Sequence, residues 1–213
     1  MANEKLELGG GASIISRKRK FKTKTEEMEM KEELKREGLE WIKAFAIGIV
    51  IFAFIRTFFF SNYIVEGESM MPTLEDGNKL VVNKIGYQIG DLERFDVIVF
   101  HANEQEDYVK RIIGLPGDHI EYSDDQLFIN GKKIEEPYLD RYRMEIPGEK
   151  LTGDFTLQEI TGVESVPEGK LFVLGDNRRG SWDSRQFGFI DADQVVGEVN
   201  LRYWPLDEMD VSF

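Results

Sequence analysis

The chain has 213 residues, no cysteine and a formal net charge of −13, and 31% of its residues are charged. This length allows one domain with a sizeable core, or one domain with an insertion, and the lack of cysteine excludes disulfides, thiolate metal sites and a cysteine nucleophile. Residues 1–60 hold 12 of the 27 basic and nine of the 40 acidic residues, so residues 61–213 carry a charge of −16, which argues against nucleic-acid binding.

The segment before position 41 is rich in both basic and acidic side chains. Residues 1–22 contain a triglycine, and we expect them to be disordered. From Thr23 the sequence T-K-T-E is typical of a helix cap, and Glu27 and Lys31 stand at the i,i+4 spacing of a helical ion pair. We therefore expect a solvated helical stalk after Thr23, with the basic run at 17–24 in contact with anionic lipid.

A transmembrane anchor is predicted for residues 41–60, which read W-I-K-A-F-A-I-G-I-V-I-F-A-F-I-R-T-F-F-F. A helix of that length spans about 30 Å, the thickness of the hydrocarbon layer. Lys43 and Arg56 lie near its ends, where long side chains can reach the headgroups, and Trp41 and Tyr63 would lie near the interfaces. A buried helix of a soluble protein is the alternative, but the run is apolar on every face. A cleavable signal peptide is disfavoured, because the charged leader would be unusually long and no A-x-A site follows.

The charges that flank this anchor predict its orientation. Nine Lys and Arg residues precede it from position 17 onward, whereas residues 61–90 contain only Lys79 and Lys84. Residues 1–40 are therefore expected in the cytoplasm and residues 61–213 outside the cell membrane, in a single-pass arrangement. Arg56 argues weakly in the opposite direction.

After residue 62 the sequence changes to short β-rich runs separated by turn signals, so the body is predicted to be mostly β. The expected strands are residues 79–85, 95–101, 107–114, 169–175 and 195–204. Residues 127–134 predict a hairpin with Asn130-Gly131 at its two-residue turn, and no useful helical period appears. Residues 136–168 are expected to be loops around short strands. We assign 61–213 to one extracytoplasmic catalytic domain with a smaller insertion at 115–168.

Residues 66–74 read E-G-E-S-M-M-P-T-L and place Ser69 where the chain turns out of a strand. A serine hydroxyl is a poor nucleophile without a base to take its proton. The two histidines, His101 and His119, have no orienting acid at a suggestive spacing apart from the adjacent Asp118. We interpret both as surface or turn residues.

Lys110 is the stronger candidate for the base. Strand alternation places it on one face with Tyr108 and Ile112, where it would be partly desolvated, although an edge-strand charge is the alternative. About 0.4% of an unperturbed lysine is neutral at pH 8, and a pKa lowered by about 2–3 units makes a large fraction available. The loop at 174–188, L-G-D-N-R-R-G-S-W-D-S-R-Q-F-G, offers hydroxyls that could hold the lysine amine and charges for salt bridges.

Three segments resemble the successive boxes of type I signal peptidases: S-M-M-P-T-L, Y-V-K-R-I-I-G-L-P-G-D and G-D-N-R-R-G-S-W-D-S-R. The resemblance covers about residues 40–205, and the single anchor and short body look like the gram-positive branch. It implies two antiparallel sheets and an exposed apolar face that lies on the membrane and includes residues near Met70 and Met71. It implies neither a metal nor a cofactor.

By this resemblance Ser69 is the nucleophile and Lys110 the general base. Ser181 matches the serine that orients the lysine amine, and Asp183 and Arg185 match residues that brace the site. The positions that match pockets for small side chains are Tyr63, Val65, Met70, Leu74, Leu80, Tyr108 and Val109.

Two positions depart from the family pattern. Relatives often have R-G-D where this chain reads Arg94-Phe95-Asp96, and the sequence does not indicate what the Phe95 ring packs on. Gly67 stands where some members carry a serine whose hydroxyl aids the oxyanion hole, which leaves the Ser69 backbone N–H as a candidate donor. Two interpretations of Gly67 are open: the position is simply without the hydroxyl donor, or glycine is needed there for an unusual backbone conformation. We expect the first, in which case Gly67→Ala should have almost no effect on activity.

The resemblance implies a membrane-anchored serine endopeptidase that uses a Ser-Lys dyad to cleave signal peptides, which have small residues before the cleavage site. Its partners would be exported preproteins and the lipid bilayer, and not nucleic acid. One alternative is a Ser-Lys self-cleaving regulator, which the anchor and the acidic body disfavour. Another is an inactive or scaffolding membrane-tethered β protein, which the presence of Ser69, Lys110 and Ser181 disfavours.

Overall fold

The computed structural model describes residues 11–84 and 92–211, except for the side chains of 11–23, Thr25 and Thr57. The chain divides into two compact units, with the boundary between Phe54 and Ile55. We describe each unit by itself, first the long helix and then the β-rich body.

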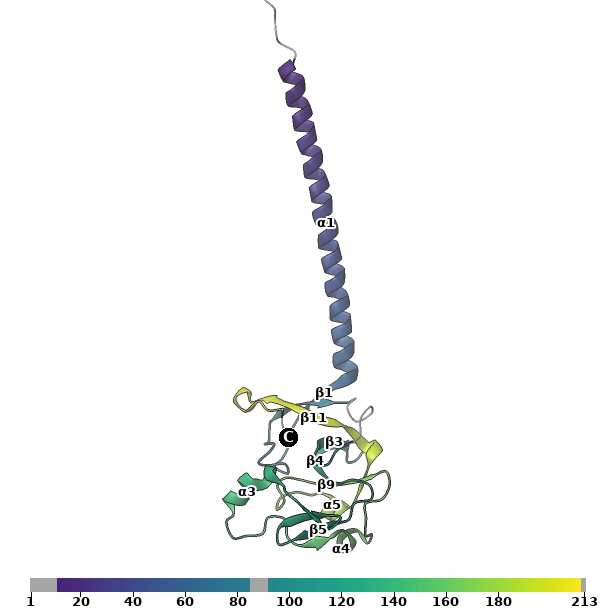
Figure 1. The fold of residues 1–213 in the computed structure, drawn as a ribbon, viewed down its shortest axis with the longest axis vertical. Helices are drawn as coiled ribbons and strands as arrows, with labels where there is room; N and C mark the ends of the chain where they lie inside the picture. Colours follow the sequence, from purple (N-terminus) through teal and green to yellow (C-terminus); the bar gives the residue numbers. More distant parts are fainter. Residues whose placement is uncertain (1–10, 85–91, 212–213) are drawn as a thin grey trace, which may run out of the picture. The chain divides into compact units, whose positions relative to one another are not determined.

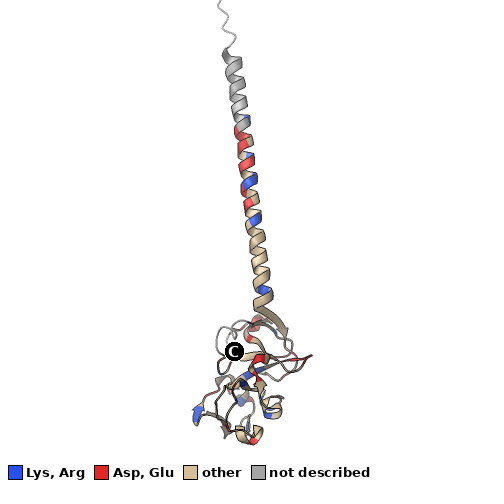
Figure 2. Ribbon diagram, turned by 90° about the vertical axis from the view of Figure 1, so that its right-hand side faces the viewer, with Lys and Arg blue, Asp and Glu red and all other residues tan. Residues whose placement is uncertain are grey.

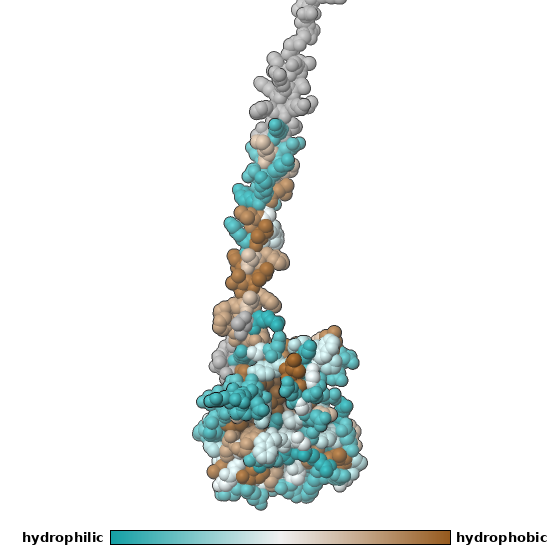
Figure 3. Space-filling model, turned by 180° about the vertical axis from the view of Figure 1, so that it is seen from behind, coloured by the Kyte–Doolittle hydropathy of each residue, from teal (hydrophilic) through white to brown (hydrophobic). Residues whose placement is uncertain are grey.

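One long helix, α1, runs from Gly11 to Phe59. Figure 2 shows acidic and basic residues interspersed along its described N-terminal part, followed by a stretch without charges that ends at Arg56. The same stretch carries hydrophobic side chains in Figure 3, and its large apolar residues, such as Phe45 and Phe52, are exposed. Within the described residues, α1 is the one helix that is long and apolar enough to cross a membrane.

The helix begins earlier than the sequence indicated. The expected disorder of residues 1–22 is wrong from Gly11 onward, and the helix passes through Thr23 rather than starting there. Residues 12–22 contain neither glycine nor proline, so nothing in them interrupts a helix that continues from the stalk. Residues 1–10 lie outside the described residues, as do the side chains at 17–22 that we expected to contact lipid.

The body consists of two antiparallel sheets (Figure 1), which confirms the predicted fold class. The larger sheet has the order β1-β2-β11-β3-β4-β9-β10, formed by Phe60–Ile64, Lys79–Asn83, Val195–Trp204, Val97–His101, Asp107–Gly114, Lys170–Leu174 and Ile190–Asp191. The smaller sheet has the order β7-β6-β5-β8, formed by Lys132–Ile134, Gln126–Ile129, Ile120–Ser123 and Phe155–Thr156.

The chain between β4 and β9 forms this smaller sheet, while β4 and β9 pair directly with each other. The domain boundaries that we drew from the sequence nevertheless stay a prediction. The expected strands 107–114 and 195–204 have the same bounds in the structure, and the hairpin turns at Asn130 and Gly131, with φ of 51° and 74°. Three short strands, β1, β5 and β10, were not expected, whereas β8 falls among the short strands expected in 136–168.

The expectation that 136–168 contains only loops and strands is wrong, because two short helices lie there, α3 (Asp140–Glu145) and α4 (Leu157–Thr161). The sequence did carry a signal for α4. Thr156 and Glu159 form a reciprocal capping box, in which each side chain accepts from the backbone N–H of the other. Further short helices are η1 (Pro137–Leu139), α5 (Ser184–Phe187), η2 (Ala192–Gln194) and η3 (Leu206–Glu208).

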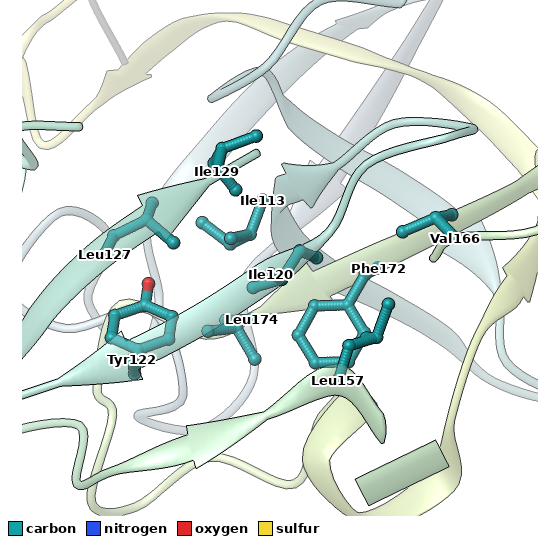
Figure 4. Close-up of a cluster of buried hydrophobic side chains, with 9 residues drawn as sticks. All are labelled: Ile113, Ile120, Tyr122, Leu127, Ile129, Leu157, Val166, Phe172 and Leu174. Carbon is teal, nitrogen blue, oxygen red and sulfur yellow. The ribbon is translucent and has the colours of Figure 1, made fainter. Parts of the chain in front are cut away.

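The core of the body lies in three hydrophobic clusters. One joins the two sheets (Figure 4), with Ile113, Phe172 and Leu174 from the larger sheet against residues of the smaller sheet such as Tyr122 and Leu127. A second cluster packs on β2, β3 and β11 beneath Ser69, and a third packs on β3, β4, β9 and β11. Strand β4 is therefore buried along most of its length, which fixes the position of Lys110.

Phe95, whose packing the sequence left open, lies in a turn just before β3 and not in the strand. Its φ is 79°, a conformation that is costly for a bulky residue and open to glycine. The ring packs against Tyr138, with 5.5 Å between centroids, and its carbonyl accepts a 2.8 Å hydrogen bond from Arg111. The positive φ explains why glycine suits this position in R-G-D, and the ring contact offsets the backbone cost here.

Candidate active site

Ser69 lies between β1 and β2, in a tight turn that buried side chains hold from below. Met70 and Leu74 are 1% and 0% exposed and belong to the cluster under the turn, and the Leu74 N–H donates to the Met70 carbonyl at 2.9 Å. Because its neighbours point into the core, the half-buried Ser69 side chain stays at the surface of the turn. Met70 itself is therefore buried, and the exposed apolar face that we expected near Met70 and Met71 stays a prediction.

Lys110 reaches Ser69 from β4. Its Nζ lies 2.8 Å from Ser69 Oγ and 2.9 Å from the Val109 carbonyl, and it is 5.3 Å from the centroid of the Tyr108 ring. The residue is only 4% exposed. The two residues that the sequence proposed as nucleophile and base are thus in direct hydrogen-bonding contact, although they stand 41 residues apart.

Burial changes the charge state of Lys110. Desolvation lowers its pKa from 10.5 to about 8, and the carboxylates of Asp183 and Asp176 oppose this shift. Desolvation prevails because the ammonium loses its water shell, while both carboxylates are themselves bound by arginines, Arg185 and Arg111. At pH 8 about half of the Lys110 side chain is therefore neutral and able to accept a proton.

The loop after β9 holds the Ser69 turn in place. The Asn177 N–H donates to the Ser69 carbonyl at 3.1 Å, and its side-chain amide donates to the Glu68 carbonyl at 3.0 Å. The fully buried Asp176 accepts two bonds from Arg111, at 2.9 and 2.6 Å, and one from Thr73 at 2.5 Å. These contacts connect the turn, β4 and the loop in one network.

Gly175 brings the same loop very close to the turn. A Cβ at Gly175 would collide with the Ser69 carbonyl and with the Ser181 hydroxyl. Only glycine leaves room for this approach.

Asp183 and Arg185, which we expected to brace the site, form an ion pair beside the loop that carries Gly175. Asp183 is fully buried, accepts from the Gly175 N–H at 3.0 Å and binds Arg185 at 2.9 and 2.8 Å. Ser181 differs, because its buried Oγ has no hydrogen-bond partner among the described residues. The bond to the Lys110 amine that the resemblance implied is absent from this geometry.

A cavity of about 360 Å³ opens beside the dyad. Residues 63–70 line it on one side and 107–110 on the other, together with Gly180 and Trp182. Five of the seven expected pocket residues line it, namely Tyr63, Val65, Met70, Tyr108 and Val109. Leu74 and Leu80 do not line it; both are fully buried in the cluster beneath the turn, and their place in a substrate pocket stays a prediction.

Neither His101 nor His119 lines the cavity. The hydrogen-bond partner of Ser69 Oγ is Lys110 and not a histidine. The expectation that His101 lacks an orienting acid is wrong, because its Nδ1 lies 2.6 Å from Asp107 Oδ1. Among the described residues, no group of three or more His, Asp or Glu side chains is arranged to hold a metal ion.

Sequence reasoning did not single out Arg111, Asp176 and Asn177, although all three stand inside the quoted segments. Arg111 and Asp176 could have been proposed as a pair, since a buried charge needs an opposite charge. The role of Asn177 depends on the conformation of the loop and left no sequence signal.

A model of the family described as "Signal peptidase, peptidase S26" matches residues 38–204, well over half of the chain. The chain belongs to the signal peptidase family, peptidase S26. It is a serine peptidase that cleaves signal peptides, as the comparison with curated relatives supports. The signal peptidase I of Bacillus caldolyticus is 54% identical over 184 residues, 86% of this chain and 100% of the relative.

A second curated relative agrees with this assignment. The signal peptidase IB of Staphylococcus aureus is 47% identical over 184 residues, which cover 84% of this signal peptidase and 96% of the relative. This chain is also similar to the crystal structure of a signal peptidase I from Enterococcus faecalis, with 46% sequence identity and a TM-score of 0.49. The match covers 52% of this chain and 97% of the chain in that structure.

The lowered pKa of Lys110 generates a prediction for the pH dependence of this signal peptidase. If the neutral amine is the base, kcat/KM should rise roughly tenfold between pH 7 and pH 9, through the pKa of about 8. The measurement is a pH series with a peptide substrate that has no group titrating in that range. A kcat/KM that is already at its plateau by pH 6 would contradict the lysine base.

Gly67 has a φ of 87°, and its N–H donates to Asp76 at 2.8 Å. A Cβ there would meet open space, so the constraint on this position is the backbone conformation and not a clash. This contradicts our expectation that Gly67 lacks only a hydroxyl donor. The structure supports the alternative, in which the turn needs glycine to present Ser69.

We therefore expect Gly67→Ala to lower kcat/KM roughly five- to tenfold, since a residue forced to positive φ costs about 1 kcal/mol or more. Gly67→Asn should keep more activity than Gly67→Ala, because asparagine tolerates positive φ, and Gly67→Val should keep the least. Steady-state kinetics on one peptide would rank the three variants. Wild-type activity of Gly67→Ala would reinstate the missing-donor interpretation.

Proposed function

We propose that this signal peptidase works through a Ser69–Lys110 dyad. The observation that carries the proposal is the 2.8 Å contact between Lys110 Nζ and Ser69 Oγ, made by a lysine that burial has brought to a pKa of about 8. A neutral amine at that distance can take the hydroxyl proton as the oxygen attacks. No imidazole is needed for this step.

The reaction would proceed in two halves. Ser69 Oγ attacks the scissile carbonyl and its proton passes to Lys110; the resulting ammonium then protonates the leaving amine, which departs and leaves an acyl-enzyme. Neutral Lys110 next takes a proton from water, which attacks the ester, and returns the proton to Ser69 Oγ. The Ser69 backbone N–H is our candidate donor to the oxyanion, since Gly67 has no hydroxyl to offer.

The bracing residues would keep the dyad in this geometry. Asn177 fixes the Ser69 carbonyl, and Asp183 fixes the Gly175 N–H where the loop approaches Ser69 most closely. Ser181 lies against Gly175 and remains our candidate for a contact with the lysine amine once substrate has bound.

We also propose that α1 anchors the peptidase in the cell membrane as a single span, with the N-terminus in the cytoplasm and the body outside. The uncharged stretch between Lys43 and Arg56 and the excess of basic residues before it support this. The substrates would be exported preproteins whose small side chains before the cleavage site fit the cavity beside the dyad. The net charge of −16 over residues 61–213 argues against a nucleic-acid partner.

Replacement of either dyad residue should abolish processing. Ser69→Ala and Lys110→Ala should each lower kcat on a purified preprotein by about 10³-fold or more, and Lys110→Arg should be as inactive, since a guanidinium stays protonated. The mass of the released signal peptide and mature protein reports the cleavage. His119→Ala is the matched control and should cleave at the wild-type rate. Substantial turnover by Lys110→Ala would rule out the dyad.

The orientation has its own test. Protease added to cells stripped of their wall should digest the body and leave the N-terminal 40 residues, detected by an N-terminal tag, protected. Protection of both parts in intact cells, with digestion only after lysis, would contradict the proposed orientation. A cytoplasmic marker protein must stay intact in the same sample.

A further inference from the structure

A tyrosine hydroxyl outside the cavity reaches the loop that holds the Ser69 turn. Tyr142 is half-buried on α3 and does not line the cavity beside the dyad. Its OH donates to Asn177 Oδ1 at 2.8 Å, although the two residues stand 35 positions apart. The contact therefore connects the chain between β7 and β8 with the loop after β9.

The Asn177 amide is bound at both of its ends. Its Oδ1 also accepts from the Gly180 N–H at 3.1 Å, and its Nδ2 donates to the Glu68 carbonyl at 3.0 Å. A backbone N–H can only donate and a carbonyl can only accept, so these two contacts fix which end of the amide is oxygen. A Cβ at Gly180 would lie 2.8 Å from Asn177 Nδ2, so the amide also has little room. The Tyr142 OH adds a further bond at the oxygen end.

The Glu68 carbonyl belongs to the same peptide unit as the Ser69 N–H. This peptide bond is trans, so its C=O and N–H point in opposite directions from one plane. A group that holds the Glu68 carbonyl therefore also sets the direction of the Ser69 N–H. Within the residues that the structure describes, the Ser69 N–H donates to no other group, which leaves it available for the oxyanion role that we assigned to it.

The fold does not depend on the Tyr142 hydroxyl. Tyr142 belongs to none of the three hydrophobic clusters, and the next residue of the loop, Arg178, is held separately by a fully buried ion pair with Glu136 at 2.7 Å. Nor does the hydroxyl act on the base, since the pKa of Lys110 responds to desolvation and to two carboxylates. What the hydroxyl does hold is the Asn177 amide.

We propose that Tyr142 is a positioning residue for the reaction, which acts through the Asn177 amide to aim the Ser69 N–H at the oxygen that becomes negative when Ser69 attacks. That oxygen is a neutral carbonyl in the bound substrate, so a well-aimed donor stabilises the transition state more than the ground state. This inference rests on the proposed function, because it presupposes attack by Ser69 and an oxyanion bound by the Ser69 N–H.

The first test compares Tyr142→Phe with Tyr203→Phe in the full-length protein in detergent. Tyr203 is a half-buried residue of β11 that does not line the cavity, and its variant should keep wild-type kinetics. Tyr142→Phe should lower kcat on a peptide substrate roughly three- to tenfold, the effect of one lost hydrogen bond, and change KM less than about twofold. A wild-type kcat, or a loss that falls on KM instead, would refute the role of Tyr142.

The pH profile separates positioning from a loosened site. Because Tyr142 does not act on the base, the rise of kcat/KM in Tyr142→Phe should keep its midpoint at a pKa of about 8. A midpoint that moves toward the ordinary lysine value would mean that the packing around Lys110 has changed, and would contradict a role confined to the Ser69 N–H.

A peptide aldehyde probes the oxyanion directly. Ser69 Oγ forms a bond to the aldehyde carbon, the Ser69 proton passes to Lys110, and the carbonyl oxygen takes the negative charge. Tyr142→Phe should raise the inhibition constant of the aldehyde by about the factor by which kcat falls. The matching peptide alcohol has no carbonyl, and its inhibition constant should not change. An equal rise for both compounds would refute the proposal, since it indicates general disruption of the site.

Asn177 tests the path of the effect. Asn177→Asp keeps an oxygen for Tyr142 but places a second oxygen against the Glu68 carbonyl, so kcat should fall further than in Tyr142→Phe. In the Asn177→Ala variant the group through which the hydroxyl acts is gone, so adding Tyr142→Phe should lower kcat no further. Losses that multiply in the double variant would contradict this path.

The outcomes also separate the role of Tyr142 from the function on which it rests. If wild-type protein cleaves no signal peptide, or if Ser69→Ala cleaves as fast as wild type, the proposed function fails. If wild type cleaves, Ser69→Ala does not, and Tyr142→Phe keeps the wild-type kcat, the dyad stands and the role of Tyr142 is refuted.

Discussion

The proposed chemistry depends on the burial of one amine. An ordinary lysine on the surface would be charged and of no use as a base at neutral pH. Moving the pKa of Lys110 from 10.5 to about 8 corresponds to about 3 kcal/mol. Because the folded-state pKa is lowered, this cost is fully present below pH 8 and disappears as the pH rises from about 8 to 10.5. The packing around β4 therefore has to offset the unfavourable burial of Lys110, which is the condition for the role as a base that we propose for it.

The acidic residues near the dyad are arranged so that they do not cancel this effect. A free carboxylate close to Lys110 would restore the ammonium. Both nearby carboxylates instead bind guanidinium groups, Asp176 that of Arg111 and Asp183 that of Arg185. The same two carboxylates accept hydrogen bonds from Thr73 and from the Gly175 N–H. The two carboxylates thus hold the loops around Lys110 in place, while their effect on the pKa of Lys110 stays smaller than that of desolvation.

Local sequence signals identified the parts of the site that lie within single segments. Ser69 and Lys110 were predicted from their turn and strand, and the strands 107–114 and 195–204 from their composition. Strand β1 was missed because its first residue continues the aromatic run of the anchor. The His101–Asp107 contact was missed because it depends on the β3–β4 register, in which these two residues face each other. The complete burial of Leu74 and Leu80 results from packing between segments that are distant in the sequence, and the spacing of residues within one segment does not indicate it.

Strand β4 carries two cations side by side in sequence, and alternation sends them to different partners. Lys110 meets Ser69, while Arg111 meets Asp176 and the Phe95 carbonyl. A slip of this strand by one residue would place a guanidinium, which cannot lose its proton, beside Ser69, and would place the lysine amine opposite the Asp176 carboxylate. We therefore expect a one-residue insertion or deletion within β4 itself to be more damaging than most substitutions there.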